Sequence, residues 1–160
     1  MKIPTKSISS KAVFSACNLY RYVLERTFEQ GTGAVNFLML NPSTADEYFN
    51  DPTIARCEKW AMEQGYKTLL ITNVFAFRAT NPQDMLVHDE LTENNDVYIL
   101  EAAQKSHKII CGWGNWGYKR QADILELLKG FNLQCFKINK NGTPSHPLYI
   151  SMRALVALER

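Results

Sequence analysis

The feature that most constrains this chain is an apolar run, residues 35–40 (VNFLML), that stops at an Asn-Pro pair. A continuous apolar run of this length is typical of a strand buried on both faces, and Pro42 cannot donate a ladder hydrogen bond, so strand pairing should end there. A helix is predicted next, because Asp51 is a good N-cap, Pro52 suits the first helical position, and apolar residues recur at helical spacing up to Gly65. The stretch therefore predicts a buried strand, a polar loop and a capped helix.

Apolar runs and helical patterns alternate along the rest of the chain. Further strands are predicted at residues 67–73, 107–111 and 133–138, and further helices at residues 92–105 and 118–129. Strands that alternate with helices form right-handed βαβ units. We therefore expect an α/β fold with a four-stranded, mainly parallel sheet.

The two ends of the chain carry weaker signals. Residues 1–10 are polar and are expected to lie loosely on the surface. Residues 11–27 contain two β-rich pieces, which predict an N-terminal β-hairpin with Arg21 and Arg26 on its second arm. We interpret these arginines as solvated strand residues rather than as a phosphate clamp, because exposed arginine is common. A short last helix is predicted over residues 153–158.

Composition limits the classes of function. With 160 residues, 46% of them hydrophobic and 21% charged, the chain is expected to form a single domain over residues 1–160. A net charge of +2 is too mild to indicate a nucleic-acid-binding protein by itself. The four cysteines form no CxxC pair and no signal peptide is visible, so we expect a cytoplasmic protein with free thiols, no cofactor and no structural metal. No apolar run approaches the ~20 residues that cross a bilayer, so no membrane partner is expected.

Polar and aromatic side chains gather just after the predicted strands. Because the carboxyl ends of parallel strands share one edge of a sheet, we expect these side chains to line one cleft. The candidates are Asn41, Ser43, Asp46, Tyr48, Phe49, Asn73, Arg78, Trp113, Asn115 and His146. Asparagine can pair with the amide-like edge of a nucleobase, aromatic rings offer stacking faces, and histidine can donate to a developing anion. The pattern predicts a nucleobase pocket, although asparagine and histidine at strand ends also satisfy loop backbone, and aromatic residues also fill cores.

Four motifs resemble a known family. The stretches LNPSTADEYFNDPTIARC, GYKTLLITNVFAFRAT, CGWGNWG and SHPLY occur in the order found in a domain-of-unknown-function family of bacteria and phages with an LNPSTAD signature. The resemblance spans about residues 20–149. It implies kinship but no particular reaction.

The layout is also similar to the uracil-DNA glycosylase superfamily. This resemblance implies a three-layer α/β/α fold, with the four-stranded sheet between helices, an active site at the carboxyl ends of the strands, and here an additional N-terminal β-hairpin. It implies that Asn41 positions the attacking water and that Phe49 or Tyr48 stacks on the base. It further implies that Asn73 reads the base edge and that His146 donates to the base carbonyl oxygen.

Three hypotheses for function follow. The first is an N-glycosidase-like hydrolase acting on a base in DNA or in a nucleotide, which needs hydrogen-bond donors, a positioned water and a stacking surface. Asparagine cannot act as a general base, so Asp46 is the candidate base, although a turn-stabilising role for it is equally open. The second is a non-catalytic reader of a modified base or small nucleotide, and the third is a metal-dependent hydrolase using Asp46. The segment after His146 lacks the superfamily's duplex-invading wedge, which favours a nucleobase, nucleotide or single-stranded DNA as the partner.

Overall fold

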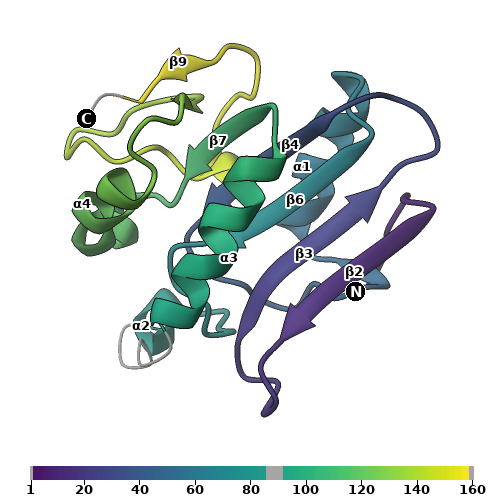
Figure 1. Ribbon diagram of the computed structural model, residues 1–160, viewed down its shortest axis with the longest axis horizontal. Helices are drawn as coiled ribbons and strands as arrows, with labels where there is room; N and C mark the ends of the chain where they lie inside the picture. The colour runs from purple at the N-terminus through teal and green to yellow at the C-terminus, as the bar shows by residue number, and fades with distance from the viewer. Residues whose placement is uncertain (1, 86–91, 159–160) are drawn as a thin grey trace.

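The protein is built on one seven-stranded mixed sheet with the strand order β2-β3-β6-β4-β7-β8-β9 (Figure 1). The computed structural model describes residues 2–85 and 92–158. The strands of the sheet are β2 (Ser9–Phe14), β3 (Arg21–Thr27), β4 (Ala34–Met39), β6 (Thr68–Asn73), β7 (Lys108–Gly112), β8 (Leu133–Cys135) and β9 (Val156–Ala157). Strand β4 pairs in parallel with β6 and β7, and β7 pairs in parallel with β8. Four parallel strands therefore form the centre of the sheet.

Antiparallel strands extend this parallel centre on both sides. Strands β2 and β3 form the expected N-terminal hairpin, and β3 pairs antiparallel with β6, so the hairpin belongs to the main sheet. At the other edge β9 pairs antiparallel with β8, where the sequence had indicated a helix over residues 153–158. That prediction is wrong because the segment contributes backbone hydrogen bonds to an otherwise open edge of the sheet. The prediction of a mixed α/β fold is confirmed.

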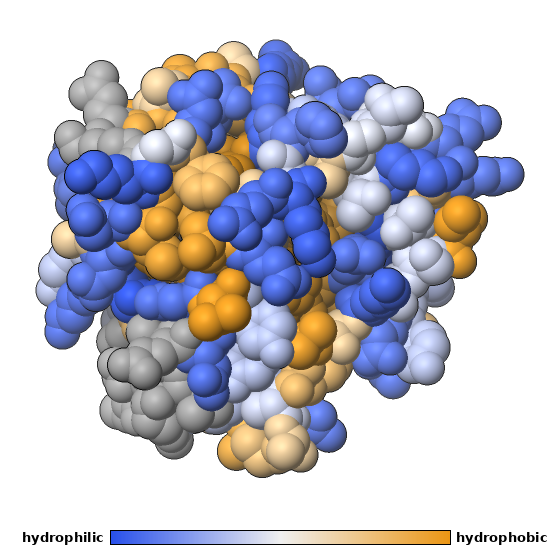
Figure 2. All heavy atoms as spheres, viewed as in Figure 1, coloured by the Kyte–Doolittle hydropathy of each residue, from blue (hydrophilic) through white to orange (hydrophobic). Residues whose placement is uncertain are grey.

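Helices cover both faces of the sheet. These are α1 (Pro52–Glu63), α2 (Pro82–Met85), α3 (Thr92–Lys105) and α4 (Tyr118–Leu127), with short 3-10 turns η1 (Asn115–Gly117) and η2 (Pro147–Tyr149). Helix α3 crosses the face of the sheet that Figure 1 presents, and α1 lies behind the sheet. The surface of that face is largely hydrophilic, with hydrophobic groups gathered between α3 and α4 (Figure 2). No helix in the described part of the chain has the length and apolar character needed to cross a membrane.

The packing of strand β4 explains why all but one of its residues are apolar. Val35 and Phe37 pack in a cluster with residues of α1, whereas Leu38 packs in a second cluster with residues of α3 and α4. Successive side chains of a strand point to opposite faces, so a strand covered on both faces has no polar side to present. Residue Asn36 is the exception, and its Nδ2 donates to the Leu70 carbonyl at 3.1 Å.

Helix α1 begins as the sequence indicates. The Asp51 carboxylate accepts a hydrogen bond from the Ile54 backbone N–H at 2.9 Å, and Pro52 occupies the first helical turn, where no N–H is needed. This cap fixes the start of the helix directly after the loop that follows β4. As a result the first turn of α1 lies beside the carboxyl ends of the parallel strands.

Residues 2–10 are tied into the fold more firmly than the loose segment predicted for residues 1–10. Strand β1 (Ile3–Pro4) pairs with β5 (Phe49–Asn50) in a separate two-stranded sheet, and Ser9 and Ser10 belong to β2. The Lys6 N–H donates to Glu58 of α1 at 2.9 Å. The segment is therefore held to the α1 side of the molecule by backbone pairing and by a buried carboxylate.

The interpretation of Arg21 and Arg26 as solvated residues is wrong. Both side chains are buried, with 1% and 0% relative exposure. The guanidinium of Arg26 lies 3.7 Å from the Glu58 carboxylate and donates to Asn50 Oδ1 at 2.7 Å. The partners come from β5 and α1, which are remote in sequence, so a strand pattern alone could not reveal this burial.

Candidate functional site

A cavity of about 610 Å³ opens at the carboxyl ends of the parallel strands. Its wall is formed by the segments that follow β4, β6 and β7, by residues 137–150 beyond β8, and by the first turn of α1. This is the edge at which open parallel sheets bind ligands, because loops leaving several strands converge there. The cleft predicted from the sequence would lie in this region.

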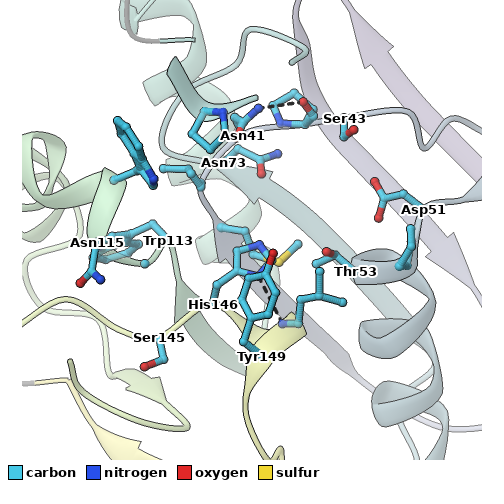
Figure 3. A pocket seen from close by; sticks show the side chains of 18 of the residues that line it. Asn41, Ser43, Asp51, Thr53, Asn73, Trp113, Asn115, Ser145, His146 and Tyr149 are labelled. Carbon is cyan, nitrogen blue, oxygen red and sulfur yellow. Dashed lines mark hydrogen bonds between the residues drawn. The ribbon is translucent and has the colours of Figure 1, made fainter. Parts of the chain in front are cut away.

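Six of the predicted residues line the cavity. They are Asn41, Ser43, Asn73, Trp113, Asn115 and His146. In Figure 3, Asn41 and Asn73 lie along one side of the opening, and His146 and Tyr149 lie along the opposite side. Residues more than 100 positions apart in sequence are thus brought to one hollow by the parallel arrangement of the strands that carry them.

Asn73 is the most informative of these residues. It ends β6, its side chain is 1% exposed, and neither Oδ1 nor Nδ2 has a hydrogen-bond partner among the described residues. Its backbone carbonyl is held by Asn95 Nδ2 at 2.8 Å, so the position of the residue is fixed although its amide is unpaired. Buried amides in proteins are nearly always paired. An unpaired amide in a cavity wall presents one donor and one acceptor to a ligand.

Asn41 has a different hydrogen-bonding state. Its Nδ2 donates to the carbonyls of Ala79 at 2.7 Å and Pro42 at 3.1 Å. Both N–H groups of the amide are thereby directed at backbone carbonyls, and Oδ1 is left as an acceptor. The residue can accept a hydrogen bond from water or a ligand, but it cannot take a proton.

His146 is held as a neutral hydrogen-bond donor. Its Nδ1 accepts the Leu148 backbone N–H at 3.2 Å, which leaves the ring proton on Nε2. Burial lowers the pKa of His146 from 6.5, and the Asp51 carboxylate opposes this shift. The imidazole is therefore uncharged at neutral pH and offers an Nε2–H donor to the cavity.

Ser43 and Asn115 occupy the outer parts of the cavity. The Ser43 hydroxyl lies 3.3 Å from Thr80 Oγ1. Asn115 is exposed, and its Oδ1 accepts a hydrogen bond from Thr143 Oγ1 at 3.2 Å. Each already has a protein partner, so both residues are more suited to shaping the entrance than to reading a ligand.

The aromatic lining differs from the expected one. Trp113, Trp116 and Tyr149 line the cavity, whereas Tyr48 and Phe49 do not. Trp113 is fully buried and its Nε1 donates to Gln121 at 2.9 Å, while Trp116 and Tyr149 are 43% and 81% exposed. Stacking faces are therefore supplied from the β7 and η2 sides, with a fixed ring inside and two exposed rings at the rim.

The later part of the loop between β4 and α1, residues 46–49, lies outside the cavity lining. The Asp46 carboxylate accepts the backbone N–H groups of Tyr48 and Phe49, both at 2.9 Å, which is the turn-stabilising role. Phe49 lies in β5, paired with β1, and its ring centroid is 4.9 Å from Lys2 Nζ. The loop is folded onto the N-terminal segment, so Asp46, Tyr48 and Phe49 do not line the cavity.

Arg78 also lies outside the cavity lining. Its Nη1 donates to the Asn18 carbonyl at 3.1 Å, and its guanidinium sits 4.8 Å from the centroid of the Phe14 ring. Both partners belong to the N-terminal hairpin. Arg78 therefore anchors the start of the long segment after β6, of which residues 86–91 lie outside the described part of the chain.

Three charged residues that the sequence did not single out as site residues line the cavity, namely Arg21, Asp51 and Lys137. Asp51 was interpreted only as a helix cap, although its place between a strand-end loop and a helix could have indicated a position at this edge. Arg21 gives no comparable signal, because its orientation depends on an irregularity in β3. No group of three or more His, Cys, Asp or Glu side chains that could hold a metal ion occurs in residues 2–85 and 92–158.

The model of a protein family of unknown function, DUF1643, matches residues 21–148. The chain belongs to this family. Among curated proteins and among solved structures, no match is found. The matched region of this DUF1643 protein begins at Arg21 and includes Asn41, Asn73 and His146, whereas strands β1, β2 and β9 lie outside it.

The arrangement defines what the cavity can do chemically. It offers an adjacent donor and acceptor on the amide of Asn73, an acceptor at Asn41 and a neutral donor at His146. Asp51 brings a carboxylate and Arg21 brings a guanidinium. A ligand that matches these groups has a planar ring with an amide-like edge, since aromatic rings also line the cavity.

Proposed function

We propose that this protein binds a nucleobase in the cavity and hydrolyses the N-glycosidic bond that joins the base to its sugar, in DNA or in a nucleotide. The observation that carries the proposal is the buried, unpaired amide of Asn73 in the cavity wall. Nucleobases present adjacent donors and acceptors that an asparagine amide pairs with bidentately. Nucleobases also present a flat ring that can stack on aromatic side chains.

His146 is suited to stabilise the departing base. As the bond between the sugar C1′ and the base nitrogen breaks, its electron pair moves to the base, and negative charge develops on a base oxygen. A neutral imidazole that lines the cavity and carries its proton on Nε2 is suited to donate a hydrogen bond to that oxygen. A charged imidazolium would also attract the anion, but burial of His146 disfavours it.

Asn41 and Asp51 are suited to handle the attacking water. Asn41 Oδ1 can accept one hydrogen of the water, and the Asp51 carboxylate can take its proton when the oxygen bonds to C1′. Asp51 replaces Asp46 in this role because Asp46 does not line the cavity. One Asp51 oxygen remains engaged by the Ile54 N–H, which holds the carboxylate in place.

Two features support the kinship implied by the sequence motifs. The four parallel strands β6-β4-β7-β8 match the sheet of the uracil-DNA glycosylase superfamily in number and direction. The residues that the motifs pick out at positions 41, 73 and 146 line a single cavity. We infer that the protein has a uracil-DNA glycosylase-like fold and acts on a nucleotide or on single-stranded DNA in the cytoplasm.

Base release from defined substrates tests the proposal. Purified protein is incubated with nucleotides and single-stranded oligonucleotides containing uracil, hypoxanthine or modified bases, and free base is measured by mass spectrometry. We expect release by the wild type and a reduction of about 100- to 1,000-fold in His146→Ala. Added chelator is expected to leave the rate of base release unchanged. Loss of activity in chelator would select metal-dependent hydrolysis.

Binding separates the enzyme from its alternative. Ligand binding without base release above that of Asn41→Ala would identify a non-catalytic reader of a modified base or small nucleotide. That alternative is favoured by one observation, the engagement of Asp51 in capping α1. If the protein neither binds nor releases any of these bases, nucleobase recognition itself is overturned.

A further inference from the structure

The cavity wall contains a buried cation, Arg21, that forms no ion pair with the described residues. The Arg21 side chain is 1% exposed, and its Nη1 donates to the Ala45 carbonyl at 2.9 Å. Its Nε has no hydrogen-bond partner, and no Asp or Glu among residues 2–85 and 92–158 forms an ion pair with it. Buried arginines are normally paired, because the interior solvates an isolated charge poorly.

Arg26 on the same strand shows the usual solution. It is equally buried and its Nε also has no hydrogen-bond partner among the described residues, but its guanidinium lies 3.7 Å from the Glu58 carboxylate and donates to Asn50 Oδ1 at 2.7 Å. The two arginines lie on the same strand and are equally buried. They differ because Arg26 lies beside a carboxylate, whereas Arg21 lines a cavity. The contrast indicates that the charge of Arg21 is directed at something that enters the cavity.

A β-bulge explains how Arg21 reaches the cavity. The register between β2 and β3 shifts so that Val13 faces Val23 while Phe14 faces Arg21, which leaves Tyr22 as an extra residue. Because of this insertion Tyr22 stacks on Tyr98 of α3, on one side of the sheet. Bulges reorient side chains in this way and are common next to active sites. Without the bulge, strand alternation would place Arg21 on the opposite face from Leu24 and Arg26.

The guanidinium remains charged in its buried position. Burial lowers the pKa of Arg21 to about 10, and the Asp51 carboxylate opposes this shift. A pKa near 10 still leaves the side chain protonated at neutral pH. With Nη1 held by Ala45, the Nε and Nη2 edge is the one available for a planar, two-point contact.

We propose that Arg21 binds the phosphate group of the ligand, so that the protein recognises a nucleotide unit rather than a free base or nucleoside. This inference rests on the proposed function for the base end of the ligand, where Asn73 and His146 lie. The cavity of about 610 Å³ has room for a base, a sugar and a phosphate. Arginine is the side chain best matched to phosphate, because its fork of N–H groups contacts two oxygens at once.

Paired ligands that differ only in the phosphate test this inference on the wild-type protein. Isothermal titration calorimetry is performed with deoxyuridine, deoxyinosine, thymidine and deoxycytidine and with their 5′-monophosphates. We expect each monophosphate that binds to do so about 10- to 100-fold more tightly than its nucleoside. A single-stranded trinucleotide distinguishes a phosphate within a strand from that of a free nucleotide, according to which binds more tightly.

Two variants connect the preference to Arg21. In Arg21→Gln the side chain can still donate to Ala45 but carries no charge, and the preference for monophosphates should disappear while nucleoside affinity is retained. In Arg153→Gln, which removes an exposed arginine outside the cavity lining, the preference should persist. Thermal unfolding of the wild type in inorganic phosphate, compared with chloride at equal ionic strength, gives a measurement that does not depend on a variant folding. We expect phosphate to raise the melting temperature.

The outcomes separate the two proposals. Equal affinity for nucleosides and monophosphates, with no stabilisation by phosphate, would overturn the phosphate site and leave nucleobase recognition standing. Stabilisation by phosphate without any nucleoside or nucleotide binding would overturn nucleobase recognition and leave an anion site. A phosphate preference that survives in Arg21→Gln would assign the anion to another group and refute the role given to Arg21.

Discussion

Replacing Asn73 with leucine should make the ligand-free protein more stable and at the same time abolish ligand binding. The amide of Asn73 is buried, and both its polar atoms lack partners among the described residues. Leucine has a similar branched shape and no polar atom to desolvate. The neighbouring cavity gives its extra volume room, so overpacking should be small.

The magnitude follows from the cost of an unsatisfied polar group. Leaving a buried donor or acceptor unpaired costs about 1–3 kcal/mol, so Asn73→Leu should raise the free energy of unfolding by about 1–2 kcal/mol after some loss to packing. For a chain of 160 residues this corresponds to an increase in Tm of about 2–8 °C. Urea titration followed by circular dichroism measures the free energy, and calorimetric titration with the nucleotides above measures the binding.

Asn36 provides a matched control. It is equally buried, in the adjacent strand β4. Its Oδ1 also lacks a partner among the described residues, but its Nδ2 donates to the Leu70 carbonyl and to Thr72 Oγ1, both at 3.1 Å. Asn36→Leu should therefore destabilise the protein by about 1–3 kcal/mol. If both variants lose stability to the same extent, the Asn73 amide is satisfied within the fold, and the central argument for ligand recognition is refuted.

Three further perturbations test other parts of the structure. The folded-state pKa of His146 lies below its ordinary 6.5, so its contribution to stability should be complete above about pH 6.5 and lost as the pH falls through the folded-state pKa. In melting curves between about pH 5 and 8, His146→Gln should remove this dependence. Arg26→Met should leave its buried carboxylate partner uncompensated and cost about 3–5 kcal/mol in urea titration, whereas Lys59→Met, which breaks an exposed pair, should cost about 0.5 kcal/mol at most. Gly112→Ala places a methyl group 2.8 Å from Pro147 Cδ, so it should cost about 1–3 kcal/mol and, by displacing the residue next to His146, weaken ligand binding in calorimetry.

The features that sequence alone identified depend on local rules. The run at residues 35–40 is apolar because β4 is covered on both faces, and Asp51 with Pro52 starts α1, as caps of this kind do in many proteins. Asn41, Asn73 and His146 were selected because they follow predicted strands. Parallel strands bring their carboxyl ends to one edge whatever their detailed packing, so the grouping of these three residues required only the topology.

Other features were decided by contacts between segments remote in sequence. Asp46 and Phe49 had plausible roles in a pocket, but pairing of β5 with β1 folds their loop onto the N-terminal segment. Trp116 and Tyr149 line the cavity instead, because η1 and η2 place them there. Local sequence cannot distinguish these outcomes, since an aromatic residue is equally compatible with a core, a rim or a binding surface.

The two arginines of β3 show the same division most clearly. Alternation along a strand specifies which residues share a face, but it cannot foresee an inserted residue that reverses the pattern. Nor can it show whether a buried guanidinium will meet a carboxylate, as Arg26 does, or a cavity, as Arg21 does. The sequence by itself determined the four parallel strands and the polar residues at their ends, while only the tertiary structure decided which charges are neutralised, because electrostatic compensation depends on distances through space.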